Sequence, residues 1–173
     1  NEPYNFFLAA FFPETDLKIY EFNRIVKDLN FLDKDVFLRK LSANFTVTEK
    51  GATSYKPLKK GEFSMYVEEH WYSLVLKNEH KDKLDAELLT ELILSPLLNI
   101  HDLKTDKRIF FVSGTKGAGE MKRIIDSGKA MAGFGLYPVT INDVIKVADS
   151  NGIMPPKTTW WSRSCGADLL FIH

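Results

Sequence analysis

The sequence predicts an α+β fold in which about four helices pack on a mixed sheet. Strand-like segments come first along the chain, and strands then alternate with helical segments. Hydrophobic residues make up 45% of the 173 residues, which is sufficient for one sizeable core. We therefore expect a single domain over residues 1–173, with 1–77 and 78–173 as candidate sub-lobes.

Strands are predicted where apolar residues run continuously or alternate with polar ones. A continuous run over 4–12 and a second segment over 17–26 open the chain, and 63–67 with 72–76 form a hairpin. Further strands are expected over 109–112, 130–137 and 169–172. Residues 46–61 are polar, carry glycine, proline and four lysines, and are expected to form a flexible connection.

Helices are predicted from their capping residues and from apolar residues at helical spacing. Asp33 is a candidate N-cap for a helix that continues to Leu41, and a second helix is expected over 85–94. A third helix follows a glycine-rich turn and ends at Gly128. Thr140 begins the fourth with a pattern that resembles a capping box, in which Asp143 takes the place of the usual Glu or Gln.

Composition excludes several classes of function. The formal net charge is +0, so the chain has no overall charge for binding nucleic acid or an anionic membrane. No apolar run has the length of a membrane span. Cys165 is the single cysteine, which rules out an intrachain disulfide and favours the cytoplasm. Because the chain begins and ends on strand-like segments, we expect it to be part of a longer protein.

The run Gly114-Thr115-Lys116-Gly117-Ala118-Gly119 joins a predicted strand to a predicted helix. Backbone N–H groups and the positive end of a helix meet at such a turn, so Gly114, Lys116, Gly117 and Gly119 are candidates for binding a phosphate. The spacing is neither that of a Walker loop nor that of a dinucleotide-binding loop. It spells the GXXG of a nucleic-acid-binding KH loop, but that loop joins two helices. The alternative is a tight turn that needs glycine only for its backbone.

Two further segments carry candidate ligand-binding residues. In Thr105-Asp106-Lys107-Arg108 a carboxylate lies beside two cations, which predicts either an ion-paired loop or an Asp106 and Arg108 that orient a substrate. Residues 154–161 contain two prolines followed by Lys157 and Trp160, which predicts either an extended arm that presents them to a ligand or a linker with a core tryptophan. The four histidines lack metal-ligand spacing, so we expect no metal site.

These motifs together resemble one family. The resemblance is carried by Asn23-Arg24-Ile25-Val26-Lys27-Asp28-Leu29-Asn30, Gly61-Glu62-Phe63, Trp71-Tyr72, Thr105-Asp106-Lys107-Arg108-Ile109, Leu136-Tyr137-Pro138 and Met154-Pro155-Pro156-Lys157-Thr158-Thr159-Trp160. In this order and spacing they are similar to the C-terminal half of the bacterial and archaeal family known as domain of unknown function 1015. The resemblance covers essentially the whole chain and adds Arg24 to the candidate ligand-binding residues.

The resemblance implies a missing N-terminal half that is similar to the ParB/sulfiredoxin-like group. Family members carry there an Asp-Gly-His-His-Arg motif suited to nucleotide phosphates, and some relatives are free-serine kinases. That motif does not occur in this chain. The chain also departs from the family at Leu103, where proline is usual, at Ser113, where glycine is usual, and in the segment 162–166, where Arg163 could replace the usual lysine.

The leading hypothesis is that the chain helps to form a cleft for a small anionic or phosphorylated metabolite. The intact protein would then use ATP or ADP with magnesium for phosphoryl transfer to a metabolite such as serine, while this part alone would be catalytically silent and hold no cofactor. The alternative is a non-catalytic domain that packs against the missing N-terminal half or forms a homo-oligomer. A ParB-like role with nucleic acid is disfavoured by the charge balance.

Overall fold

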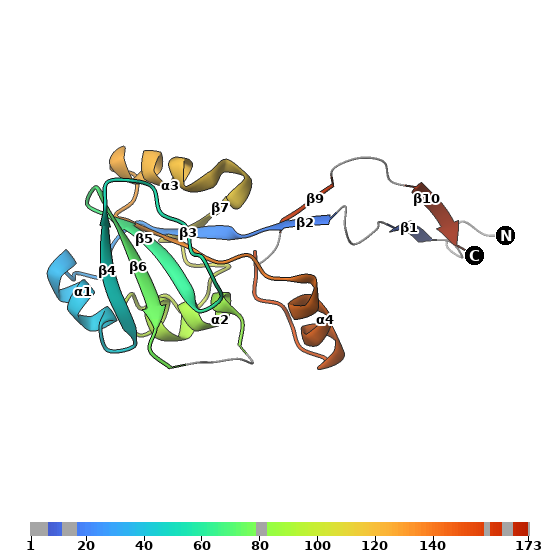
Figure 1. The fold of residues 1–173 in the computed structure, drawn as a ribbon, viewed down its shortest axis with the longest axis horizontal. Helices are drawn as coiled ribbons and strands as arrows, with labels where there is room; N and C mark the ends of the chain where they lie inside the picture. Colours follow the sequence, from blue (N-terminus) through green and yellow to red (C-terminus); the bar gives the residue numbers. More distant parts are fainter. Residues whose placement is uncertain (1–6, 12–16, 79–82, 158–159, 164–167, 173) are drawn as a thin grey trace.

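A six-stranded sheet forms the body of the protein (Figure 1). The computed structural model describes residues 7–11, 17–78, 83–157, 160–163 and 168–172. The strands in their order across the sheet are β4 (Phe45–Gly51), β6 (His70–Leu76), β5 (Glu62–Val67), β8 (Ala132–Gly135), β3 (Phe22–Val26) and β7 (Ile109–Ser113). The α+β class is confirmed. Each pairing in this sheet is antiparallel, where we expected a mixed sheet.

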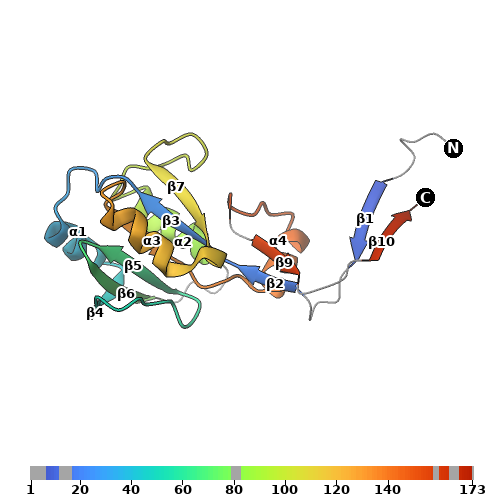
Figure 2. The ribbon, with the colours of Figure 1, turned by 90° about the horizontal axis from the view of Figure 1, so that it is seen from above.

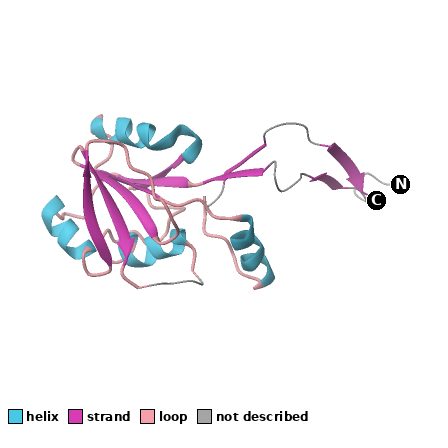
Figure 3. Ribbon diagram, in the orientation of Figure 1, coloured by secondary structure: helices cyan, strands magenta, loops and turns pink. Residues whose placement is uncertain are grey.

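Helices cover both faces of the sheet (Figure 3). They are α1 (Lys34–Leu41), α2 (Asp85–Leu89) with a π-helical continuation (Thr90–Leu94) and α3 (Gly117–Asp126), whereas α4 (Ile141–Asp149) lies beside the sheet and has no buried residue. The predicted caps are present: Val36 N donates to Asp33 Oδ1 at 2.8 Å, and Thr140 exchanges hydrogen bonds with Asp143. The capping signals in the sequence therefore place these helix starts correctly.

Two apolar cores lie on opposite faces of the sheet, because side chains alternate along each strand. Val26 of β3 belongs to the core that includes Phe37 of α1 and the helix at 85–94. Its neighbour Ile25 belongs to the other core, which includes Met121 of α3. Strand β3 is buried along its whole length as a result.

Two sequence predictions need correction. Residues 46–61 are not wholly a flexible connection, because β4 occupies 45–51 at the edge of the sheet and its polar residues face solvent. The segment 17–26 is divided at Glu21 into β2 (Leu17–Tyr20) and β3. The Glu21 carbonyl accepts a hydrogen bond from Gly114 N at 2.7 Å at this break. The sheet joins strands from both sides of residue 77, so the candidate sub-lobes 1–77 and 78–173 share one sheet.

Two short antiparallel ribbons extend from the end of the sheet at which β3 begins (Figures 1 and 2). In one, β2 pairs with β9 (Trp160–Arg163); in the other, β1 (Phe7–Phe11) pairs with β10 (Asp168–Ile172). Helix α4 is linked to the body through Lys60 Nζ, which lies 3.1 Å from Asp143 Oδ1. None of the helices in the described ranges is long and apolar enough to cross a membrane.

A buried carboxyl group predicts a pH-dependent stability. Asp85 is 4% exposed and accepts hydrogen bonds from Gly61 N, and burial raises its pKa from 3.8 to about 6. The folded chain therefore binds this proton more tightly than the unfolded chain, and the contribution to stability is lost as the pH rises from about 4 to about 6. Asp85→Asn should remove this pH-dependent loss, a difference of up to about 3 kcal/mol. Urea unfolding between pH 4 and pH 7, with the exposed Asp35→Asn as control, measures it; parallel curves for Asp85→Asn and wild type would contradict it.

A strained surface residue predicts a stabilising substitution. Phe31 is fully exposed and has φ +62°, a left-handed conformation that costs most residues about 1 kcal/mol. Phe31→Gly should therefore raise the free energy of unfolding by about 1 kcal/mol. Asn30 has φ +53° but donates through Nδ2 to the Leu97 carbonyl at 3.2 Å, so Asn30→Gly should gain nothing. Equal effects of the two substitutions in urea unfolding would disprove the assignment of strain to Phe31.

Candidate functional site

The loop between the helix at 85–94 and β7 is shaped by its own carboxylates. Asp102 Oδ1 accepts from Lys104 N at 2.8 Å, and Asp102 Oδ2 accepts from Thr105 Oγ1 at 2.7 Å. These hydrogen bonds hold the pKa of Asp102 below its usual value. A side-chain turn of this kind fixes the backbone without a glycine or proline. The loop therefore holds Leu103 and Lys104 in a defined position.

Arg108 clamps this loop to the rest of the chain. Its Nη1 donates to the Leu98 carbonyl at 3.0 Å, and its Nη2 donates to the Asn99 carbonyl at 2.7 Å. Nε and Nη2 also donate to the two oxygens of Asp106, at 3.2 and 2.8 Å, and Asp28 Oδ1 lies 3.7 Å from Nη1. The hydrogen bond with Arg108 lowers the pKa of Asp106. The geometry favours the ion-paired loop over a substrate-orienting Arg108.

The predicted arm of prolines and Lys157 lies beside the start of β3. Lys157 Nζ is 5.9 Å from the centre of the Phe22 ring, and the Lys157 backbone has φ +54°. Trp160 begins β9 and pairs with Tyr20 of β2, but its side chain lies outside the described part of the structure. The arm therefore brings an ammonium group to the end of the sheet where β3 begins and β7 ends.

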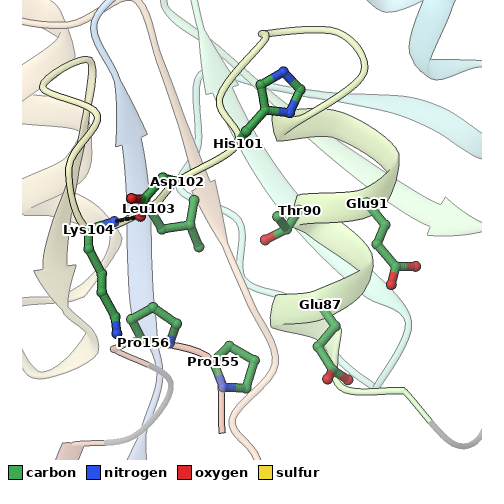
Figure 4. Close-up of a pocket in the computed structure, with 9 residues that line it drawn as sticks. All are labelled: Glu87, Thr90, Glu91, His101, Asp102, Leu103, Lys104, Pro155 and Pro156. Carbon is green, nitrogen blue, oxygen red and sulfur yellow. Dashed lines mark hydrogen bonds between the residues drawn. The ribbon is translucent and has the colours of Figure 1, made fainter. Parts of the chain in front are cut away.

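Two adjacent pockets separate the loop from the arm. The helix-side pocket has a volume of about 330 Å³ and is lined by Glu87, Thr90, Glu91, His101, Asp102, Leu103, Lys104, Pro155 and Pro156 (Figure 4). The β7-edge pocket has a volume of about 450 Å³ and is lined by Leu103, Lys104, Asp106, Ile109, Phe110, Phe111, Pro156 and Lys157. They share Leu103, Lys104 and Pro156, and the Lys104 side chain extends toward Pro156.

The two pockets differ in charge. Three carboxylates line the helix-side pocket, so an anion there would meet like charge. The β7-edge pocket presents Lys104 and Lys157, and the charge of its one carboxylate, Asp106, is compensated by Arg108. The β7-edge pocket is therefore the better site for an anion.

Arg24 lies buried beside this pocket. It is directly opposite Phe111 of β7 and Phe134 of β8, and its guanidinium carbon is 5.7 Å from the centre of the Phe111 ring. It is 1% exposed, and burial lowers its pKa to about 10. Nη1 donates to the Phe22 carbonyl at 2.5 Å, whereas Nε and Nη2 have no hydrogen-bond partner in the described part of the chain.

The glycine turn adjoins the same end of β3, and its glycines have different roles. Gly114 is buried against Glu21, where an added Cβ would lie 2.7 Å from the Glu21 carbonyl oxygen. Gly117 has φ +69°, which only glycine adopts readily. Gly119 has open space around it, and Lys116 is exposed. Lys116 lines neither of the two pockets. Close packing accounts for Gly114, and the backbone conformation of the turn accounts for Gly117.

The fold brings together only some of the predicted site residues. Asp106 and Lys157 line one pocket, and Arg24 lies next to it. Lys104 and Phe111, which no sequence motif singles out, also line this pocket. The position of Lys104 in the charged loop, next to the Thr-Asp-Lys-Arg motif, is a signal that could have identified it as a site residue. The sequence does not distinguish Phe111 from other apolar residues of a buried strand. Among the described residues, no group of three or more His, Cys, Asp and Glu side chains could hold a metal ion.

The sequence matches one family. Residues 1–95 match the profile of the family described as protein of unknown function (DUF1015). The chain belongs to this family. A search of curated proteins finds no match.

Solved structures share the fold of this DUF1015 chain. A conserved hypothetical protein from Pyrococcus furiosus is 19% identical with a TM-score of 0.51, and the match covers 91% of this chain and 61% of that protein. A mutant free serine kinase in complex with AMP is 16% identical with a TM-score of 0.52, and the match covers 86% of this chain and 55% of the kinase. At these identities the likeness shows the fold alone. The chain spans a little over half the length of these proteins.

A pair of glycine substitutions tests whether the turn is structural. Gly114→Ala should lower the free energy of unfolding by about 1–3 kcal/mol, because the new methyl group clashes with the Glu21 backbone. Gly119→Ala, in the first turn of α3, should be neutral or stabilising by up to about 1 kcal/mol. Thermal or urea unfolding measures both. Equal tolerance of the two substitutions would contradict the close packing at Gly114.

Proposed function

We propose that this DUF1015 chain forms one wall of a cleft that binds a small anionic or phosphorylated ligand. The observation that carries the proposal is the β7-edge pocket, in which Lys104 and Lys157 are the charged groups without a compensating carboxylate in the lining. An ammonium group is a flexible point charge and suits a phosphate, which accepts hydrogen bonds from many directions. The volume of about 450 Å³ accommodates a small metabolite.

We further propose that the intact protein uses this cleft for ATP- or ADP-dependent phosphoryl transfer to a small metabolite such as serine. The shared fold with a free serine kinase in complex with AMP supports this step. Phosphoryl transfer depends mainly on positioning and on neutralising charge, so Lys104 and Lys157 would contribute by holding an anionic group in place. Magnesium and the nucleotide would be bound mainly by the remainder of the intact protein, and this chain alone would be catalytically silent.

One observation favours the alternative, an interaction domain. Strands β1 and β10 form a separate two-stranded sheet that extends away from the body (Figure 1). Two strands alone are marginally stable in water, and both sequences, FLAAF and DLLFI, are rich in apolar residues. A second surface, from the N-terminal half of a longer protein or from another copy of the chain, would stabilise this ribbon.

Binding measurements on lysine variants test the proposed cleft. Phosphate, pyrophosphate, phosphoserine, ADP and ATP should raise the unfolding midpoint of the intact protein at constant ionic strength. Lys157→Met and Lys104→Met should each weaken binding several-fold, on the scale of one charged hydrogen bond. Lys107→Met removes an exposed lysine of the same loop that does not line the pocket, and it should leave binding unchanged.

The outcomes separate the cleft from non-specific attraction. Equal losses in all three lysine variants would mean that only the net charge matters. If none of the phosphate compounds binds, the proposed cleft is wrong. Phosphoryl transfer by the 173-residue chain alone would refute the assignment of catalysis to the intact protein.

A further inference from the structure

The two unpartnered nitrogens of Arg24 form one binding edge. Nε and Nη2 lie on the same side of a guanidinium, where their N–H groups are parallel and match the two oxygens of a carboxylate. Nη1, on the other side, is occupied by the Phe22 carbonyl. The unsatisfied atoms are thus one complete bidentate fork.

An anion would satisfy both the hydrogen-bonding groups and the charge of this fork. A guanidinium stays charged at neutral pH, and a buried charge without a counter-ion costs several kcal/mol. No described carboxylate makes an ion pair or hydrogen bond with Arg24, and its contact with the Phe111 ring does not replace a counter-ion. A structural arginine would show its pairing within the chain, as Arg108 does with Asp106.

The fork lies next to a residue that lines the β7-edge pocket. Phe111 lines the pocket and also contacts the Arg24 guanidinium. Arg24 binds the carbonyl of Phe22, and Lys157 Nζ lies over the ring of Phe22. The two cations therefore contact the same residue, and a small molecule that displaced the Phe111 ring would be able to span them.

We propose that Arg24 binds the carboxylate of a small carboxylic acid whose phosphorylated or phosphoryl-accepting end lies at Lys157 and Lys104. This inference rests on the proposed function of the cleft. A planar carboxylate carries one negative charge, which a single buried guanidinium neutralises. A phosphate dianion would leave excess charge in the apolar layer between Phe111 and Phe134, and it is better placed at the exposed lysines.

Two ligands that differ only in the carboxylate test the proposal. Phosphoserine and phosphoethanolamine share a phosphate and an amine, and only phosphoserine carries a carboxylate. Calorimetric titration of the intact protein should give a preference for phosphoserine on the order of 10- to 100-fold, the scale of a bidentate charged pair. Arg24→Met should abolish this preference and leave phosphoethanolamine binding unchanged. Arg39→Met, at an exposed position of α1, is the matched control and should preserve the preference.

The lysine variants separate this inference from the proposed function. Lys157→Met should weaken both ligands by the same factor. If both ligands bind wild type and Arg24→Met with equal affinity while Lys157→Met weakens them, the carboxylate site is wrong and the phosphate cleft stands. If neither ligand binds, both proposals are wrong.

Stability and spectroscopy complete the test. Without ligand, Arg24→Met should unfold at the same or a higher temperature than wild type, because it removes an unpaired buried charge. A markedly lower midpoint together with an unchanged preference for phosphoserine would make Arg24 a structural residue. Should the variant not fold, the Arg24 Nε–H resonance of the wild-type protein decides: phosphoserine should shift it and phosphoethanolamine should not, and equal responses would overturn the proposal.

Discussion

Strand β3 contributes side chains to two cores and pairs with two neighbouring strands. This double constraint determines where the residues of the candidate site lie. Ile25 points into the core beneath α3, and Val26 points into the core beneath α1 and α2. With the register fixed in this way, Arg24 must share the face of Val26 and lie between Phe111 and Phe134. A slip of one residue would move all of these side chains to the opposite face. The burial of a charged group is therefore imposed by the sheet.

The edge of the sheet along β7 combines rigid and flexible cations. Arg108 is held by two carbonyl groups and by Asp106, so the loop that it clamps forms a fixed wall. Lys104 and Lys157 are exposed and keep their rotamer freedom until an anion binds. Arg24 is held at Nη1 and by its packing. A fixed fork selects ligands by geometry, whereas flexible ammonium groups attract any anion, so the buried group is the better source of specificity.

Local signals in the sequence predicted local structure well. Asp33 and Thr140 mark helix starts through hydrogen bonds within a few residues, and both caps are present. Strand β4 was missed because an edge strand exposes polar residues and resembles a loop. Arg24 was selected through the family resemblance, but its burial beside Phe111 depends on the strand order β8-β3-β7, which no local pattern encodes. The pocket likewise joins residues near 104, 111 and 157, which only the tertiary fold brings together.

Because Arg24 is buried without a counter-ion among the described residues, ligand binding at this residue would change the stability of the sheet. In the ligand-free chain the uncompensated guanidinium opposes burial of β3, while the two cores on either side favour it. A carboxylate bound at the fork would remove this opposing contribution, so the gain in stability would arise at β3, β7 and β8 rather than at the exposed arm. A ligand held only by Lys104 and Lys157 would leave the buried charge uncompensated and would stabilise mainly the surface. A bound ligand protects backbone amides from hydrogen exchange. The position of the protected amides therefore shows whether the ligand has reached Arg24 or only the two lysines.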